Sequence, residues 1–247
     1  MGRSEAAVAD IRFDIRFASA AKSYKELAHQ TAAWNWLQEQ LAGSPVIDQF
    51  AKMYRADPPV KPEASPSPGG LTNPLAVPFF AQQDNGPEGW RQCQTSSIAM
   101  CLAYLKTPGI KDDTDYLKVV NRFGDTTAQE THRKALASLG VRARFRQDLT
   151  ATELMGEIKG GYPVAIGILH HGPVSAPSGG GHYIVVRGFD TTAGNWLVHD
   201  PYGELDLVNG GWASQSPTAG KDQSYSFRNL NPRFMPGGSG GWGWVFS

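Results

Sequence analysis

The pattern of apolar and polar positions changes along the chain. Between residues 93 and 159 apolar side chains recur mostly at helical spacing, which predicts helices with a buried face. Further on, short runs rich in β-branched and aromatic residues stand between glycine-rich loops, which is typical of strands. The expected helices are 93–106, 112–122, 126–139 and 150–159, and the expected strands are 141–146, 163–169, 182–189, 195–200 and 242–246. Helices first and strands afterwards indicate an α+β fold rather than an alternating βαβ fold.

The first 76 residues follow another pattern. Residues 24–54 carry apolar side chains at helical spacing around a Gly-Ser-Pro break, and residues 11–17, IRFDIRF, alternate like a short strand. Residues 57–78 contain seven prolines, which remove backbone donors and favour extended conformations. The predicted organisation is a helical N-terminal segment at 1–56, a Pro-rich linker at 57–76 and one domain at 77–247.

Length and charge exclude several classes of protein. A chain of 247 residues can bury a core without disulfides or metals. Its 23 Lys and Arg balance 23 Asp and Glu, and no basic stripe interleaved with aromatics stands out, so nucleic acid is not an expected partner. The charged N-terminus lacks the apolar core of a signal peptide, and no window approaches the ~18 apolar residues of a membrane span. We expect a soluble chain made in the cytoplasm, without membrane insertion.

Both cysteines lie in one predicted helix, within WRQCQTSSIAMCLAYL at residues 90–105. About 12 Å of helix separates Cys93 from Cys101, beyond the ~7 Å that a disulfide tolerates, so no bridge is expected. Cys101 falls on the apolar stripe with Ile98 and Leu102 and is predicted to pack in the core. Cys93 lies at the helix start, where unpaired N–H groups and the helix dipole favour a thiolate. Cys93 is either a nucleophile or a buried thiol, and a nucleophile needs a base.

A candidate base lies in GGGHYIVVRGFDTTAGNWLVHDPYGE, residues 179–204, which predicts a β-hairpin. A turn centred on residue 191 would place Val185 opposite Leu197 and His182 opposite Asp200, with α-carbons about 4.5–5.5 Å apart. A carboxylate beside an imidazole fixes its tautomer and stabilises its protonated form, as a base for cysteine requires. His182 could otherwise be a histidine at a strand edge, and a one-residue slip would separate the pair.

The other histidines offer weaker sites. His170, His171 and His199 could join a cysteine in a zinc site, but no close Cys-Cys spacing or HExxH motif supports one. We therefore predict neither a metal nor a cofactor. His29 and His132 fall in helical, charged surroundings and are predicted to lie at the surface.

Taken together, these segments resemble the papain-like cysteine peptidases of the bacteriocin-processing, double-glycine type, over about residues 77–204. VPFFAQQDN at 77–85 resembles the strand and glutamine before the nucleophile, and the cysteine-headed helix follows. LASLGVRARF and LTATELMGEIKGGYPVAIGI, within 136–168, resemble the central helix and strand. GGGHYIVVRGFD and WLVHDPYGE resemble the histidine and aspartate strands of that family.

The resemblance implies a papain-like fold and a role for each matching residue. Cys93 would be the nucleophile, His182 the base, Asp200 the orienting acid and Gln82 the oxyanion donor, with Gln83 as the neighbouring alternative. The family usually has Cys-Gly where this chain has Cys93-Gln94.

The tail, with GELDLVNGGW, YSFRNLNPRF and GGWGW, resembles peptidases that bacteriophages carry as lytic enzymes (endolysins). This implies hydrolysis of peptide or peptidoglycan amide bonds through a thioester, acting on the cell wall after release. Two other hypotheses stay open. One is a catalytically silent module that binds cell-wall or peptide ligands, and the other is a transpeptidase or deamidase, because a triad alone does not choose the acyl acceptor.

Overall fold

The structure, a computed structural model, describes residues 73–247. The strand expected at 11–17, the helices at 24–54 and the linker residues 57–72 lie outside the described residues. In chain order the elements are η1 (Gln82–Asp84), η2 (Gly89–Arg91), α4 (Cys93–Tyr104), α5 (Asp113–Val120), α6 (Gln129–Ser138), β1 (Ala143–Leu149), α7 (Ala151–Lys159), β2 (Val164–Ile168), β3 (His182–Asp190), β4 (Asn195–His199), β5 (Glu204–Leu205), β6 (Trp212–Ser214), β7 (Gln223–Ser226), α8 (Phe227–Phe234) and β8 (Gly241–Phe246).

Six strands form one antiparallel sheet in the order β1-β8-β2-β3-β4-β7, and β5 and β6 form a separate two-stranded ribbon. The α+β order predicted from the sequence is confirmed, and the predicted elements agree with the observed ones to within a few residues. The strands β5, β6 and β7 and the helix α8 were not predicted. The strands are too short to show a period-2 pattern, and α8 contains Pro232.

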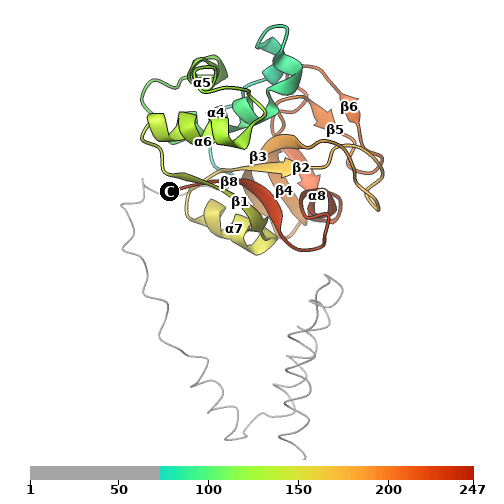
Figure 1. The fold of residues 1–247 in the computed structure, drawn as a ribbon. Helices are drawn as coiled ribbons and strands as arrows, with labels where there is room; N and C mark the ends of the chain where they lie inside the picture. The colour runs from blue at the N-terminus through green and yellow to red at the C-terminus, as the bar shows by residue number, and fades with distance from the viewer. Residues whose placement is uncertain (1–72) are drawn as a thin grey trace, which may run out of the picture. The chain divides into compact units, whose positions relative to one another are not determined.

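Helices cover both faces of the sheet (Figure 1), with α4, α5 and α6 grouped on one side and α7 on the other. The central helix α4 packs against β3 and β2, and every residue from Gln94 to Leu102 is buried. The single apolar stripe predicted for this helix is therefore too narrow, because α4 is enclosed on all sides. Cys101 is completely buried, as the sequence predicts.

The start of the described chain belongs to the sheet region. Leu75 is 1% exposed, and its N–H donates to the carbonyl of Arg187 at 2.7 Å. The Asn73 side chain pairs with the backbone N–H and carbonyl of Phe189. Residues 73–75, which the sequence pattern assigns to the linker, thus pack against β3. None of the helices in the described part of the chain has the length and apolar character that crossing a membrane requires.

Candidate active site

Cys93 is the first residue of α4, and its side chain is half-buried. The helix begins there because Gln92 is outside the helical region while its carbonyl accepts the first helical bond, from the Ser96 N–H at 3.0 Å. No side chain caps this helix start. The first N–H groups of α4 therefore have no side-chain acceptor and can interact with an anion at the helix start.

Gln82 lies in η1, which packs against α4, and only 1% of the residue is exposed. Its Nε2 donates to the carbonyl of Gly89 at 2.8 Å. Because a carbonyl only accepts, this contact fixes the orientation of the amide and leaves its second N–H for another acceptor. A Cβ at Gly89 would lie 2.4 Å from the carbonyl oxygen of Gln82, so only glycine permits this approach.

The neighbouring Gln83 has a different environment. Its side chain is partly exposed and donates to the carbonyl of Tyr202 at 2.7 Å. The backbone N–H of Gln82 donates to the carbonyl of Pro201 at 2.9 Å. Both glutamines thus attach their loop to the segment that follows Asp200, but only Gln82 is buried.

His182 and Asp200 are hydrogen-bonded to each other. His182 begins β3 and Asp200 follows the last residue of β4, and the distance from His182 Nε2 to Asp200 Oδ1 is 2.7 Å. The two residues are 4% and 0% exposed. The structure therefore brings together the histidine and the carboxylate that the hairpin pattern singled out.

The predicted hairpin register, however, is wrong. Val185 lies opposite His199 rather than Leu197, and a bulge between Val186 and Gly188 changes the pairing near the turn. Continued by one residue, this register places Asp200 opposite Ile184. The error is an even number of residues, so Asp200 stays on the face of His182 and meets it diagonally, within reach of a long side chain.

Asp200 has further partners that hold its carboxylate in place. Oδ1 also accepts from the Tyr202 N–H at 3.1 Å, and Oδ2 accepts from the Tyr225 hydroxyl at 3.4 Å. The Tyr225 oxygen in turn accepts the Leu205 N–H at 2.8 Å. The backbone of Asp200 passes so close to Gly220 that a Cβ there would lie 1.8 Å from the Asp200 carbonyl oxygen. These contacts fix the acceptor geometry around His182.

The charge on His182 is set by two opposing causes. Burial disfavours the imidazolium and lowers its pKa, but the Asp200 carboxylate and its hydrogen bond, with a smaller contribution from the Cys93 side chain, raise the pKa to about 10. His182 is therefore protonated at neutral pH. Since Asp200 occupies Nε2, Nδ1 is the ring nitrogen left for Cys93.

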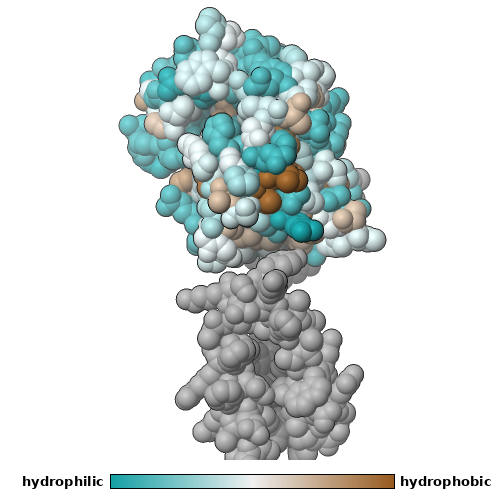
Figure 2. All heavy atoms as spheres, turned by 90° about the vertical axis from the view of Figure 1, so that its right-hand side faces the viewer, coloured by the Kyte–Doolittle hydropathy of each residue, from teal (hydrophilic) through white to brown (hydrophobic). Residues whose placement is uncertain are grey.

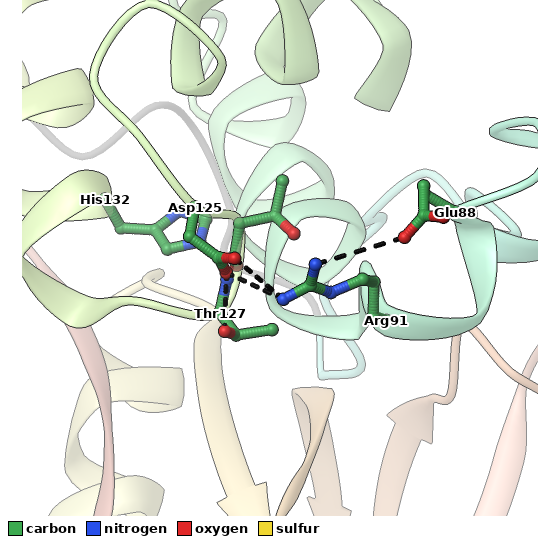
Figure 3. A network of polar contacts seen from close by, with 6 residues as sticks. Glu88, Arg91, Asp125, Thr127 and His132 are labelled. Atoms are coloured by element: carbon green, nitrogen blue, oxygen red, sulfur yellow. Dashed lines mark hydrogen bonds and ion pairs between the residues drawn. The ribbon is translucent and has the colours of Figure 1, made fainter.

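Polar contacts anchor the start of α4 to the rest of the helical layer. Asn85 and Ser96 both bond to the buried carboxylate of Asp113, whose pKa is raised by burial. Arg91, two residues before Cys93, binds Asp125 through Nη2 at 2.8 Å (Figure 3). Asp125 also accepts from the backbone N–H and hydroxyl of Thr127. These contacts connect η2 to the loop before α6 and so position Cys93.

Two of the remaining histidines in the described part of the chain, His132 and His199, are buried and hydrogen-bonded to other residues. The surface position predicted for His132 is wrong, because it is 0% exposed and bonds the Tyr116 hydroxyl and the Thr126 carbonyl. His199 is also buried, with Nε2 bonded to the Val77 carbonyl and Nδ1 to the Asp222 N–H. Both ring nitrogens of each histidine are hydrogen-bonded, so neither histidine is available to bind zinc. Within residues 73–247 no group of three His, Cys, Asp or Glu side chains could hold a metal.

Three aromatic residues near His182 were not predicted from the sequence. Trp212 of β6 meets the His182 ring edge-on, with centroids 4.9 Å apart and planes at 88°. Tyr202 and His170 lie further out, at 6.4 and 5.8 Å. Tyr202 could have been suspected because it follows Asp200-Pro201, but no local signal points to Trp212, which reaches the site only through the β5–β6 ribbon.

Comparison with known proteins identifies the family. The model of the Peptidase_C39 like family matches residues 74–210, more than half of the chain, and the chain belongs to this family of cysteine peptidases. The matched region contains Gln82, Cys93, His182 and Asp200. No curated protein matches the chain.

Three solved structures match the chain at low sequence identity. A C39-like peptidase from Bacillus anthracis is 16% identical, with a TM-score of 0.42, over 71% of this chain and 96% of that one. The peptidase domain of Streptococcus ComA, a bifunctional ABC transporter, is 14% identical, with a TM-score of 0.43, over 64% and 92%. A double-glycine motif protease from an AMS/PCAT transporter, solved with a leader peptide, is 19% identical, with a TM-score of 0.35, over 73% and 94%.

Proposed function

We propose that this protein is a cysteine peptidase that hydrolyses peptide amide bonds through a thioester on Cys93. The observation that carries the proposal is the buried 2.7 Å hydrogen bond between His182 and Asp200, together with a Cys93 side chain that further raises the His182 pKa. A charged imidazolium beside a sulfur stabilises the thiolate, which is the attacking form of cysteine.

The acylation step uses Cys93, His182 and Gln82. The thiolate of Cys93, its proton held by His182, forms a bond to the substrate carbonyl carbon, and the carbonyl π electrons move to oxygen. The second N–H of Gln82 and the backbone N–H of Cys93 stabilise this oxyanion. The C–N bond then breaks, and the amine leaves with the proton of His182.

Deacylation reverses the proton movement. Water gives a proton to His182 and attacks the thioester carbon, the C–S bond breaks, and the acid leaves while the thiolate is restored. Throughout, Asp200 keeps His182 in one orientation and stabilises its charged form.

Peptidoglycan as the substrate is the finer part of this proposal, and it rests on the tail alone. The family match ends at residue 210, so it does not reach most of the tail. In the described structure these residues form β7, α8 and β8, and both strands belong to the central sheet. Stem and cross-linking peptides of the cell wall are one substrate class to test, and linear peptides are the other.

The test incubates the protein with purified muropeptides and with a synthetic peptide library in H₂¹⁸O. Hydrolysis puts one ¹⁸O into the new carboxylate, whereas a transpeptidase joins the acyl group to an amine without ¹⁸O. Mass spectrometry should show labelled products with the wild type and none with Cys93→Ala, while the buried Cys101→Ala variant serves as the matched control. If no peptide is cleaved and Cys93 resists iodoacetamide at neutral pH, the binding-module hypothesis replaces the peptidase.

A further inference from the structure

Three aromatic rings lie around His182, the residue that gives its proton to the departing amine in the proposed mechanism. Nε2 of His182 is bonded to Asp200, and the Cys93 side chain helps to raise the His182 pKa. Trp212, Tyr202 and His170 surround the same ring without a recorded contact to Cys93. In the proposed mechanism the departing amine takes its proton from His182, so the residue after the cleaved bond passes next to these rings.

His170 has a ring nitrogen that the fold does not use. Its Nδ1 is buried and has no hydrogen-bond partner among the described residues, which is costly unless a ligand supplies one. Burial, and then the positive charges of His182, His171 and Arg233, lower its pKa to about 4. His170 is therefore neutral at neutral pH and can exchange a hydrogen bond with a backbone group.

The segment that holds His170 is fixed rather than loose. Arg233, which is 0% exposed, donates to the carbonyls of Leu169, His171 and Gly172. The His170 carbonyl accepts from the Gly211 N–H at 2.7 Å, next to Trp212. The His170 and Trp212 rings lie 5.9 Å apart. Two elements far apart in the sequence are thus held together as one wall beside His182.

We propose that His170 and Trp212 bind the first residue after the cleaved bond, with Trp212 packing on an apolar side chain and His170 Nδ1 bonding its backbone. The inference rests on the proposed peptidase mechanism. It adds which residues the enzyme would accept directly after the cleaved bond. Figure 2 views the side of the molecule that carries β5 and β6, and its surface is mostly hydrophilic with one compact hydrophobic cluster.

The experiment measures how one acyl-enzyme partitions between water and an added amine. The acyl donor is a thiobenzyl ester of a peptide ending at the residue before the bond that the wild type cleaves. The acceptors are the amides of leucine, phenylalanine, glycine and aspartate. Because both products arise from the same thioester, their ratio does not depend on how much of a variant folds. We expect the wild type to prefer leucine and phenylalanine amides over glycine amide by about tenfold, and aspartate amide to react least.

The variants separate the two parts of the proposed wall. Trp212→Ala should remove most of the preference for apolar acceptors. His170→Phe should lower aminolysis by every acceptor about fivefold, the effect of one lost hydrogen bond, and His170→Asn, which keeps a polar atom near the Nδ1 position, should restore it. Phe123→Ala, at an exposed aromatic residue beyond α5 that makes no ring contact with His170, His182 or Trp212, is the matched control and should match the wild type.

The outcomes distinguish this inference from the proposed function. If the wild type cleaves peptides but partitions equally among the four acceptors, or if His170→Phe and Trp212→Ala leave the ratios unchanged, the inference is overturned and the peptidase stands. If the donor never acylates Cys93, the peptidase mechanism itself fails.

Discussion

The candidate site and the interior of the helical layer each contain a thiol and a buried histidine, and the pairs behave differently. In the site, Cys93 is half-buried and His182 bonds a carboxylate. In the interior, Cys101 is fully buried and His132 bonds only a hydroxyl and a carbonyl. Burial raises the pKa of the Cys101 thiol and lowers that of His132 to about 4, whereas the pKa of His182 rises to about 10.

The comparison shows that burial alone favours the neutral forms of both the thiol and the histidine. One ionised partner reverses this preference for the histidine. Both histidines are buried and both ring systems are hydrogen-bonded. Only Asp200, itself 0% exposed, makes the protonated form of His182 the stable one. In the proposed mechanism, a thiol and a histidine become a reactive pair through a third residue and through access from outside.

The largest expected effect separates the two thiols. Cys93→Ala should lower kcat/KM by about 10⁴-fold or more, because the nucleophile is lost. Cys101→Ala should keep nearly full activity and lower the free energy of unfolding by about 1 kcal/mol, since it leaves a small cavity. Peptide cleavage and urea denaturation measure the two quantities. An active Cys93→Ala would contradict the assignment.

The next effect tests whether Asp200 reverses the titration of His182. In Asp200→Asn only burial remains as a strong influence, so the pKa of His182 should fall from about 10 to below its ordinary value of 6.5. Activity should fall about 10³-fold, since the imidazolium loses its partner. Nitrogen NMR of labelled histidine follows the titration. A His182 that still titrates near its wild-type pH would show that another group holds the charge.

A third comparison concerns the two glutamines before α4. Gln82→Ala should lower kcat about 10²-fold with little change in KM, because an oxyanion donor acts only in the transition state. Gln83→Ala, which removes a bond to the Tyr202 carbonyl, should cost less than about tenfold. Steady-state kinetics on one peptide compares the two. The reverse order would move the oxyanion role to Gln83.

The last contrast between the two histidines concerns how the free energy of unfolding depends on pH. The depressed pKa of His132 stabilises the fold above pH 6.5, and this stability is lost as pH falls toward 4. The raised pKa of His182 stabilises the fold below pH 6.5, and that stability is lost as pH rises toward 10. Between pH 7 and 4, the free energy of unfolding should therefore fall by about 3 kcal/mol less in His132→Gln than in the wild type.

The comparison is His182→Gln, which should flatten the alkaline limb that His132→Gln leaves unchanged. His170 and His199, whose pKa values are also lowered to about 4, keep part of the acid limb in both variants. Unfolding in urea at a series of pH values measures both limbs. Parallel acid limbs in the wild type and His132→Gln would mean that His132 does not titrate as its burial implies.

Most of the fold was predictable because its signals are local. Helix starts at Asp112 and Thr150 have side chains that cap the next turn, and the long strands are rich in β-branched residues. The surface position predicted for His132 failed because the charged residues beside it face outward while its own ring lies under α5 and the 121–128 loop. The hairpin register failed because the turn is centred between residues 192 and 193 rather than on residue 191, and the bulge at residue 187 then shifts the pairing by one.

The sequence by itself determined the order of helices and strands, the helix-start position of Cys93, and the hairpin that carries His182 and Asp200, because spacing and periodicity are properties of neighbouring residues. Only the tertiary structure decided that Asp200 outweighs burial at His182, that Gly89 orients Gln82, and that His170 and Trp212 meet beside the site. These depend on distances between segments far apart in the chain, and on which buried groups find a charged partner.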